Sequence, residues 1–221
     1  MGVCYPPVMF AFFHVGDDCR LPSRLVRSIR QHHPDAPVYM VTDGDTPTLK
    51  GVIRHEVEVD HDNLMLSRTL GYADLGLPDP TLYLDTDMAL NRPISLRSAL
   101  GEASAGFCRR SYHRDAPFNG FQRGGAYSDL HLEPLDRIFP YVGCTVIAVG
   151  WVWAALAARH AALEPRYWAW YGDQIALRDF AAHHPVADLP ESEWAGLPDL
   201  ADDPLIWHWK GQRKKLILPA E

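Results

Sequence analysis

Two aspartates, Asp85 and Asp87, stand one residue apart directly after the apolar run "TLYL" at 81–84. An apolar run of this length predicts a buried strand. Carboxylates this close raise each other's pKa unless positive charge lies between them. Because oxygen ligands suit Mg²⁺ and Mn²⁺, the pair predicts a divalent metal site. The alternative is a solvated turn with two exposed acids, since Asp-x-Asp is common by chance.

A second cluster, "HWKGQRKK" at 208–215, lies near the end of the chain. It holds three of the four lysines in the protein, grouped around Gly211. Cations at a glycine turn are suited to hold a diphosphate. The imidazole of His208 could complete the coordination of a metal such as Mn²⁺. The alternative is a solubilising tail that follows a core histidine.

These two clusters need a scaffold that brings them together, and the first half of the chain predicts one. Strands are predicted at 8–13, 37–43, 52–60 and 81–84, and helices at 21–33 and 63–76. This order predicts an α/β fold with a mainly parallel central sheet. Ligands of such sheets bind beyond the carboxyl ends of the strands, which is where Asp85 falls.

The second half is less regular. A strand is predicted at 144–150 and helices at 151–163 and 172–184, and the segment 205–218 is predicted to close the chain with a strand, a Gly turn and a basic tail. The long connection at 109–140 is rich in Arg, Gly, Pro and aromatic residues, which is typical of a functional loop. We expect its first part, 109–131, to form a lid over the ligand. The tryptophans Trp151, Trp153, Trp168 and Trp170 could stack on sugars, but core positions are favoured for most of them.

The composition is that of a globular protein, with 47% hydrophobic and 22% charged residues among 221. This length predicts one domain, 1–221, with a nucleotide-binding half at 1–90 and an acceptor-side half at 91–221. The net charge of -7 argues against a nucleic-acid binder. The longest apolar run near the start is too short to span a membrane. The scattered cysteines, Cys4, Cys19, Cys108 and Cys144, predict reduced thiols and a cytoplasmic location.

Three segments together carry a family resemblance. They are "LSRTLGYADLGLPDPTLYLDTDMAL" at 66–90, "GDQIALRDF" at 172–180 and "IWHWKGQRKK" at 206–215. In this order they resemble the GT-A glycosyltransferases, particularly glycosyltransferase family 8. The resemblance implies the GT-A fold, a Rossmann-like nucleotide-diphospho-sugar transferase fold. It also implies a metal-dependent enzyme that uses Mn²⁺ or Mg²⁺.

The resemblance assigns roles to residues near the metal. Asp85, Asp87 and His208 would be the metal ligands. Gly211 and Lys214 would hold the diphosphate of the donor.

Four further residues match positions that contact the donor in the family. Arg68 would contact the nucleotide-sugar, and Asp173 would hold the hydroxyls of its sugar. Gln174 would lie beneath the anomeric carbon. Asp43, in the "VTD" that ends the second strand, would lie near the nucleotide base.

The implied reaction transfers a sugar from a UDP-sugar to an unknown saccharide, lipid or protein acceptor, with retention. The chain departs from the family in one strand, where "YVGCTVIAVG" replaces the expected Asn-Ala-Gly. One alternative is a haloacid-dehalogenase-type phosphatase, with Asp85 as the nucleophile and Asp87 as the acid–base group. Another is a non-catalytic module that binds sugar nucleotides. A nucleotidyltransferase is less favoured, because no Gly-rich loop follows the first strand.

Overall fold

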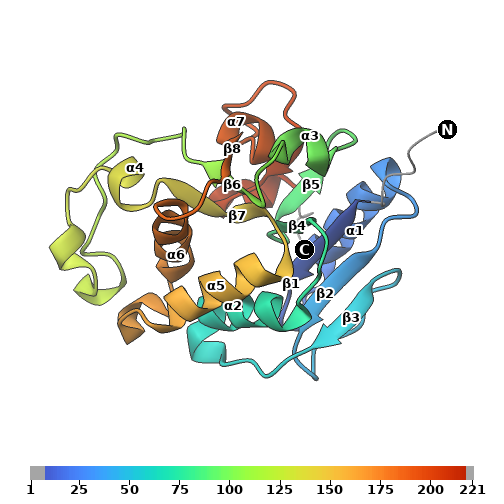
Figure 1. Ribbon diagram of the computed structural model, residues 1–221, viewed down its shortest axis with the longest axis horizontal. Coiled ribbons are helices and arrows are strands. Elements are labelled where there is room, and N and C mark those ends of the chain that lie inside the picture. Colours follow the sequence, from blue (N-terminus) through green and yellow to red (C-terminus); the bar gives the residue numbers. More distant parts are fainter. Residues whose placement is uncertain (1–7, 218–221) are drawn as a thin grey trace.

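A seven-stranded sheet runs through the protein in the order β3-β2-β1-β4-β7-β6-β8 (Figure 1). The structure, a computed structural model, describes residues 8–217; Cys4 and Leu218, the last residue of the predicted closing segment, lie outside this range. The strands are β1 (Met9–Phe13), β2 (Val38–Thr42), β3 (Ile53–Glu56), β4 (Thr81–Leu84), β6 (Ala105–Arg109), β7 (Tyr141–Ala148) and β8 (Ala187–Pro190). The predicted α/β fold with a mainly parallel sheet is confirmed.

Only β7 runs against the other six strands of this sheet. It pairs with β4 so that Thr145 lies opposite Leu84, the last residue of β4. The beginning of β7 therefore reaches past the carboxyl end of β4. Its Cys144 carbonyl accepts a hydrogen bond of 3.0 Å from the Asp85 amide. This contact fixes the backbone at the point where the two predicted metal-binding aspartates begin.

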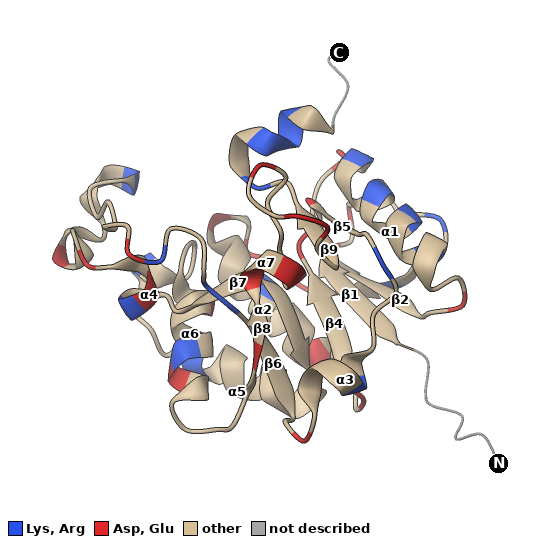
Figure 2. Ribbon diagram, turned by 90° about the horizontal axis from the view of Figure 1, so that it is seen from above, with Lys and Arg blue, Asp and Glu red and all other residues tan. Residues whose placement is uncertain are grey.

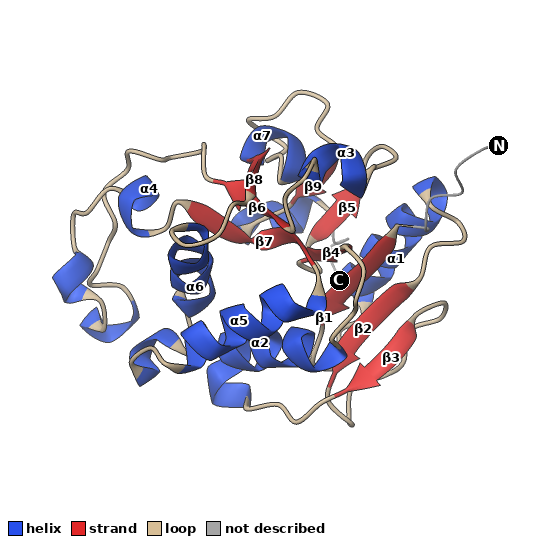
Figure 3. Ribbon diagram, viewed as in Figure 1, coloured by secondary structure: helices blue, strands red, loops and turns tan. Residues whose placement is uncertain are grey.

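Helices cover both faces of the sheet (Figure 3). Helix α1 (Arg20–His32) packs Leu25, Val26 and Ile29 on the face that also carries Phe10 and Leu82. The helices α2 (Leu64–Leu75), α5 (Gly150–Ala161) and α6 (Gly172–Ala181) cover the other face. Both faces of the sheet are thus buried, as the continuous apolar runs of the strands predict.

The predicted helices and strands are present, and the chain end follows the predicted order of strand, Gly turn and basic tail. The closing strand is β9 (Ile206–His208), which pairs with β5 (Met88–Leu90) in a separate two-stranded sheet. The 3₁₀ helix η5 (Gly211–Leu216) begins at the glycine and carries the basic residues Arg213, Lys214 and Lys215.

The short elements α3 (Leu96–Leu100) and α7 (Glu191–Trp194), together with β6 and β8, were not predicted. Segments of four or five residues are too short to show a clear period, and none of these four has the run of large apolar residues that marks β1, β2 and β4. Strands β1 to β4 come from residues 1–90 and the other three from 91–221, so one sheet spans the two predicted halves. The assignment of nucleotide and acceptor to these halves stays a prediction.

The connection after β6 packs a small apolar core of its own. It contains two 3₁₀ turns (Arg123–Gly125 and Ser128–Leu130) and the short helix α4 (Leu135–Ile138). Phe118, Tyr127 and Phe139 cluster here with the beginning of α6. The expectation that 109–131 is a lid stays a prediction. Within residues 8–217, no helix has the length and apolar content needed to cross a membrane.

The central position of β4 leads to a stability prediction. Leu82 is fully buried between the two helical layers, whereas Leu70 on α2 is 47% exposed. We expect Leu82→Ala to lower the free energy of unfolding by about 2–5 kcal/mol, because it leaves a cavity in the core. Leu70→Ala should change it by about 0.5 kcal/mol or less. Denaturant titration of both variants measures the difference, and equal losses would contradict this packing.

Candidate active site

A pocket of about 570 Å³ opens at the carboxyl edge of the sheet, beside the end of β4. It gathers all but one of the residues that the sequence proposed: Arg68, Asp85, Asp87, Asp173, Gln174, His208, Gly211 and Lys214. These residues come from α2, the β4–β5 turn, α6 and the chain end. In the sheet, β1 and β4 are neighbours, and the strand order changes direction between them: β2 and β3 lie on the far side of β1, and the later strands lie on the far side of β4. Such a switch point is where α/β sheets bind ligands.

The guanidinium of Arg68 bridges two carboxylates at the back of this pocket. It donates to Asp85 Oδ1 at 2.7 Å and to Asp173 Oδ2 at 2.6 Å. The Arg68 side chain is only 10% exposed. Burial raises the pKa of Asp85 to about 6, against the opposing effect of Arg68 and with a further contribution from Asp87. Arg68 therefore supplies one of the positive charges that favour the ionised form of the aspartate pair.

Asp87 has two cationic neighbours of its own. His208 Nε2 lies 3.5 Å from Asp87 Oδ1, and Lys214 Nζ lies 3.0 Å from Oδ2. Burial alone would raise the pKa of Asp87, but the hydrogen bond and charge of His208 and the charge of Lys214 hold it below its usual value. Burial opposes the charged form of His208 as well, yet the neighbouring Cys144 and Asp87 together raise its pKa to about 10.

The pairing of β5 with β9 explains how His208 reaches this position. Met88 lies opposite His208 in the two-stranded sheet. The Trp209 amide then donates to the Asp87 carbonyl at 2.9 Å. Backbone hydrogen bonds, and not only side-chain contacts, therefore hold His208 next to Asp87.

The three predicted metal ligands fit a divalent ion. One ligand atom from each of Asp85, Asp87 and His208 lies within 4.8 Å of the other two. Two carboxylates and one imidazole form a donor set suited to Mn²⁺ or Mg²⁺. The two carboxylates would also become less costly to bury together, because the ion adds positive charge between them.

Gln174 has a partner that sequence reasoning missed. Arg110, just after β6, donates to Gln174 Oε1 at 2.8 Å and to the Phe139 carbonyl at 2.7 Å. Close by, Glu191 accepts hydrogen bonds from the Ser111 and Tyr112 amides. Arg110 and Glu191 lie in no motif; the Arg-rich composition of 109–140 pointed towards Arg110, and nothing in the sequence pointed towards Glu191.

Of the four tryptophans considered for sugar stacking, Trp170 is the one that lines the pocket. Trp153 is a core residue and is 5% exposed, whereas Trp170 is 43% exposed and lines the pocket. The Arg123 guanidinium lies 3.4 Å from the centre of a Trp170 ring. Gln122, next to Arg123, donates to the Tyr171 hydroxyl at 2.7 Å. The loop at 109–131 thus contacts the pocket rim through these pairs.

Asp43 is the predicted residue that does not line the pocket. It follows β2 at the carboxyl edge, two strands away from β4. Its Oδ1 accepts from the Thr46 amide at 2.8 Å, and His61 lies 3.5 Å from its Oδ2. Its contact with a nucleotide base stays a prediction.

Solved structures show which fold this arrangement belongs to. The glycosyltransferase GlyE of Streptococcus pneumoniae TIGR4 superposes with a TM-score of 0.56 over 94% of this chain and 55% of GlyE, at 14% identity. The galactosyltransferase LgtC, in complex with donor and acceptor sugar analogues, gives 0.55 over 93% of this chain and 88% of LgtC, at 12% identity. The chain has the GT-A fold. This resemblance, expected from the motifs, is confirmed at the level of the fold.

The matching structures are not confined to glycosyltransferases. A putative glucose-1-phosphate thymidylyltransferase from Bacillus anthracis gives a TM-score of 0.51 over 83% of this chain and 87% of that one, at 10% identity. The chain spans only about half the length of GlyE. No protein-family model and no curated protein matches the sequence. Function must therefore be argued from the GT-A site itself.

Gly143 on β7 packs closely against the ion pair between Arg68 and Asp173, which leads to a stability prediction. A Cβ at Gly143 would collide with the Asp173 carboxylate and lie 3.2 Å from an Arg68 nitrogen. We expect Gly143→Ala to lower the free energy of unfolding by about 1–3 kcal/mol, because the buried ion pairs must shift.

The matched control for Gly143→Ala is Gly44→Ala, since a Cβ at Gly44 meets no atom within 4 Å. It should change stability by less than about 0.5 kcal/mol. Denaturant unfolding of both variants is the measurement. A Gly143→Ala variant as stable as the parent protein would show that the bridge is not tightly packed against β7.

Proposed function

We propose that the protein is a metal-dependent glycosyltransferase that takes a sugar from a nucleoside-diphosphate sugar, with a UDP-sugar as the donor. The observation that carries the proposal is the juxtaposition of Asp85, Asp87 and His208 with Lys214 in one GT-A pocket. The group that leaves in such a transfer is a nucleoside diphosphate, which gains negative charge. A site rich in fixed cations is suited to stabilise that charge.

Each charged group in the pocket has a role in this reaction. A divalent ion on Asp85, Asp87 and His208 would neutralise the diphosphate as a Lewis acid. Lys214, which is 43% exposed, can turn from Asp87 towards a phosphate oxygen. Gly211 has a positive φ of 65° and gives the chain the turn that places Lys214 there.

The surroundings of the pocket support transfer with retention. Asp173 is bonded to Arg68, and Glu191 accepts two backbone hydrogen bonds, so each is held away from the role of a free base. The bond between the anomeric carbon and the diphosphate oxygen would break while the acceptor oxygen bonds to that carbon. The acceptor's proton would pass to the departing phosphate oxygen on the same face.

Gln174 and Asp173 are placed to contact the sugar. Both lie in the first turn of α6 and line the pocket. An active-site variant of LgtC that replaces a glutamine with glutamate also matches this chain, with a TM-score of 0.58 over 92% of it and 88% of LgtC, at 13% identity. We assign Gln174 the position beneath the anomeric carbon and Asp173 the contact with sugar hydroxyls. Arg110 would orient Gln174 by holding its Oε1.

The alternatives receive less support. A phosphatase would need a free nucleophile at Asp85, yet Arg68 holds Asp85 Oδ1 at 2.7 Å. The match to a thymidylyltransferase keeps nucleotidyl transfer as a second candidate with the same fold. Two incubations distinguish these activities. A glycosyltransferase given a UDP-sugar releases UDP. A nucleotidyltransferase given a sugar phosphate and a nucleoside triphosphate releases pyrophosphate.

Metal binding gives the first test of the proposal. We expect Asp87→Ala to weaken Mn²⁺ binding in the presence of UDP by roughly a hundredfold or more, because a ligand and its fixed geometry are lost. Isothermal titration calorimetry measures it. Asp62→Ala, at an exposed position on the same edge of the fold, is the control and should bind as the parent does. Undiminished binding by Asp87→Ala would remove the metal site from the proposal.

Lys214 gives the second test. In the free site it pairs with Asp87, and on the proposal it would contact the diphosphate once metal and nucleotide are bound. Lys214→Ala frees Asp87 from a competing cation, so Mn²⁺ alone should bind roughly two- to fivefold more tightly. UDP in the presence of Mn²⁺ should bind roughly tenfold more weakly, because a charge-assisted contact to phosphate is lost.

Lys215→Ala is the neighbouring control for both Lys214 titrations, since Lys215 makes no ion pair among the described residues. It should leave both affinities within about twofold of the parent. A Lys214→Ala variant that loses affinity for Mn²⁺ and UDP alike would assign Lys214 a structural role instead.

A further inference from the structure

A strip of positive charge lies on α1, outside the pocket and away from the reacting groups. Arg24 and Arg27 form a ridge between two grooves of about 1270 and 560 Å³. Lys50 lines the larger groove, Trp207 lines the smaller one and Ile217 lines both. We call the surface formed by Arg24, Arg27, Lys50, Trp207 and Ile217 the basic face. Figure 2 shows blue on α1 and on the short helix that precedes the C-terminus, on one side of the molecule.

These cations lack anionic partners within residues 8–217. No carboxylate of that range forms an ion pair with Arg24, Arg27 or Lys50. Arg24 instead lies 3.9 Å from the centre of a Trp209 ring. Burial and the charge of Arg27 both lower the pKa of Arg24. An anion held between the two arginines would relieve their mutual repulsion.

The acids of the larger groove do not cancel this charge. Asp18 is already bonded to Arg20 at 2.8 Å, which leaves only Asp17 at that end of the groove. At the other end, Arg30 is held by the carbonyls of Pro34, Ala36 and Gly51. In a protein with a net charge of -7, this concentration of cations is local.

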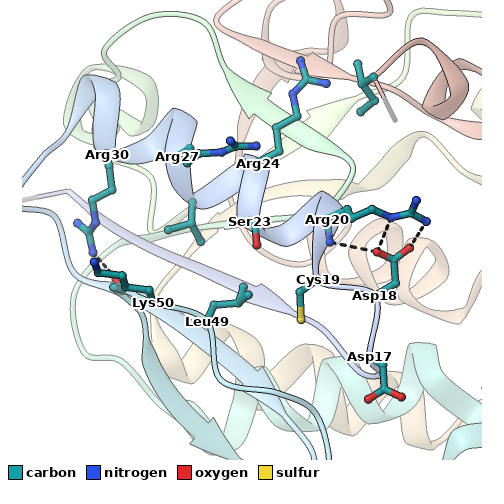
Figure 4. Close-up of a pocket in the computed structure, with 13 residues that line it drawn as sticks. Asp17, Asp18, Cys19, Arg20, Ser23, Arg24, Arg27, Arg30, Leu49 and Lys50 are labelled. Atoms are coloured by element: carbon teal, nitrogen blue, oxygen red, sulfur yellow. Dashed lines mark hydrogen bonds and ion pairs between the residues drawn. The ribbon is translucent and has the colours of Figure 1, made fainter. Parts of the chain in front are cut away.

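The shape and the apolar content of the face indicate the kind of anion. Figure 4 shows the arginine side chains spread along α1 rather than converging on one point, so the face suits an extended anionic surface better than a single phosphate. Leu216, adjacent to Ile217, is 72% exposed. Cations combined with an exposed leucine and a tryptophan are typical of a surface that meets lipid headgroups and acyl chains.

We propose that the basic face docks the protein on a membrane that contains anionic lipids. Arg24, Arg27 and Lys50 contact the phosphates of the headgroups, and Leu216 enters the acyl boundary. Helix η5 carries Leu216 and also Lys214 of the pocket, so docking brings the pocket next to the lipid. An acceptor carried on a lipid would then be within reach; that consequence rests on the proposed function.

Co-sedimentation with lipid vesicles tests the docking independently of catalysis. We expect the protein to bind vesicles of phosphatidylcholine mixed with phosphatidylglycerol and to leave phosphatidylcholine vesicles unbound. Added salt should weaken the binding, because it screens the contacts with phosphate. Arg24→Glu/Arg27→Glu should lower the binding roughly tenfold or more. Equal binding to the two kinds of vesicle, or to neither, would overturn the proposal.

Two further variants locate the contact. Arg114→Glu/Arg137→Glu makes the same change in net charge in the loop around α4, at side chains that are 60% and 73% exposed. It should keep the binding, and an equal loss would show that only the net charge matters. Because Arg24 packs on Trp209, Arg27→Glu/Lys50→Glu provides a second test that leaves this contact intact.

Leu216→Ser separates a membrane from a dissolved polyanion. It should weaken vesicle binding several-fold, because the apolar side chain that would enter the acyl boundary is lost, whereas binding to heparin would not depend on it. A parent protein that binds heparin but not mixed vesicles would overturn the proposal. Calorimetry with Mn²⁺ and UDP on the Arg27→Glu/Lys50→Glu variant should match the parent, so a failure of docking and a failure of the proposed function remain distinguishable.

Discussion

The guanidinium of Arg68, buried between Asp85 and Asp173, is the interaction on which the site depends. It joins α2 to the tip of β4 and to the first turn of α6. Removing one member of such a buried group would leave an uncompensated charge, which is strongly destabilising. The three elements that line the back of the pocket are therefore held in register by electrostatics as well as by apolar packing, and Gly143 allows β7 to approach the bridge closely.

The single antiparallel strand explains why the pocket can form at this edge. Because β7 runs against β4, its beginning reaches past the end of β4 and supports the Asp85 backbone. The other support comes from the chain end, where β9 pairs with β5 and places His208 beside Asp87. Backbone pairing thus brings together the β4–β5 turn, the beginning of β7 and the end of β9. Their side chains are then close enough to form the site.

Most of this arrangement was predictable where the signal is local or periodic. The strand "TLYL" and its two aspartates, the helix that carries Arg68 and the α6 start at Asp173 all follow from apolar runs and helical spacing. The bridge made by Arg68 was not predictable, because it depends on how α2 and α6 pack on the sheet. Arg110 was missed for the same reason: its contact with Gln174 joins residues 64 positions apart and follows from no motif. The pairing of β9 with β5 was not predicted either, because apolar content does not show which strand will be the partner.

Among the cationic neighbours of the aspartate pair, Arg68 and Lys214 differ in how readily they can leave. Arg68 is 10% exposed and bonded on both sides, whereas Lys214 is 43% exposed and, within residues 8–217, forms an ion pair with Asp87 alone. A divalent ion would therefore compete with Lys214 and leave Arg68 in place. On the proposed function, the diphosphate of the donor would give Lys214 a new anionic partner when Asp87 is engaged as a metal ligand. Binding of the ion and of the nucleotide is then favourable together, because each removes the electrostatic cost that the other would meet alone.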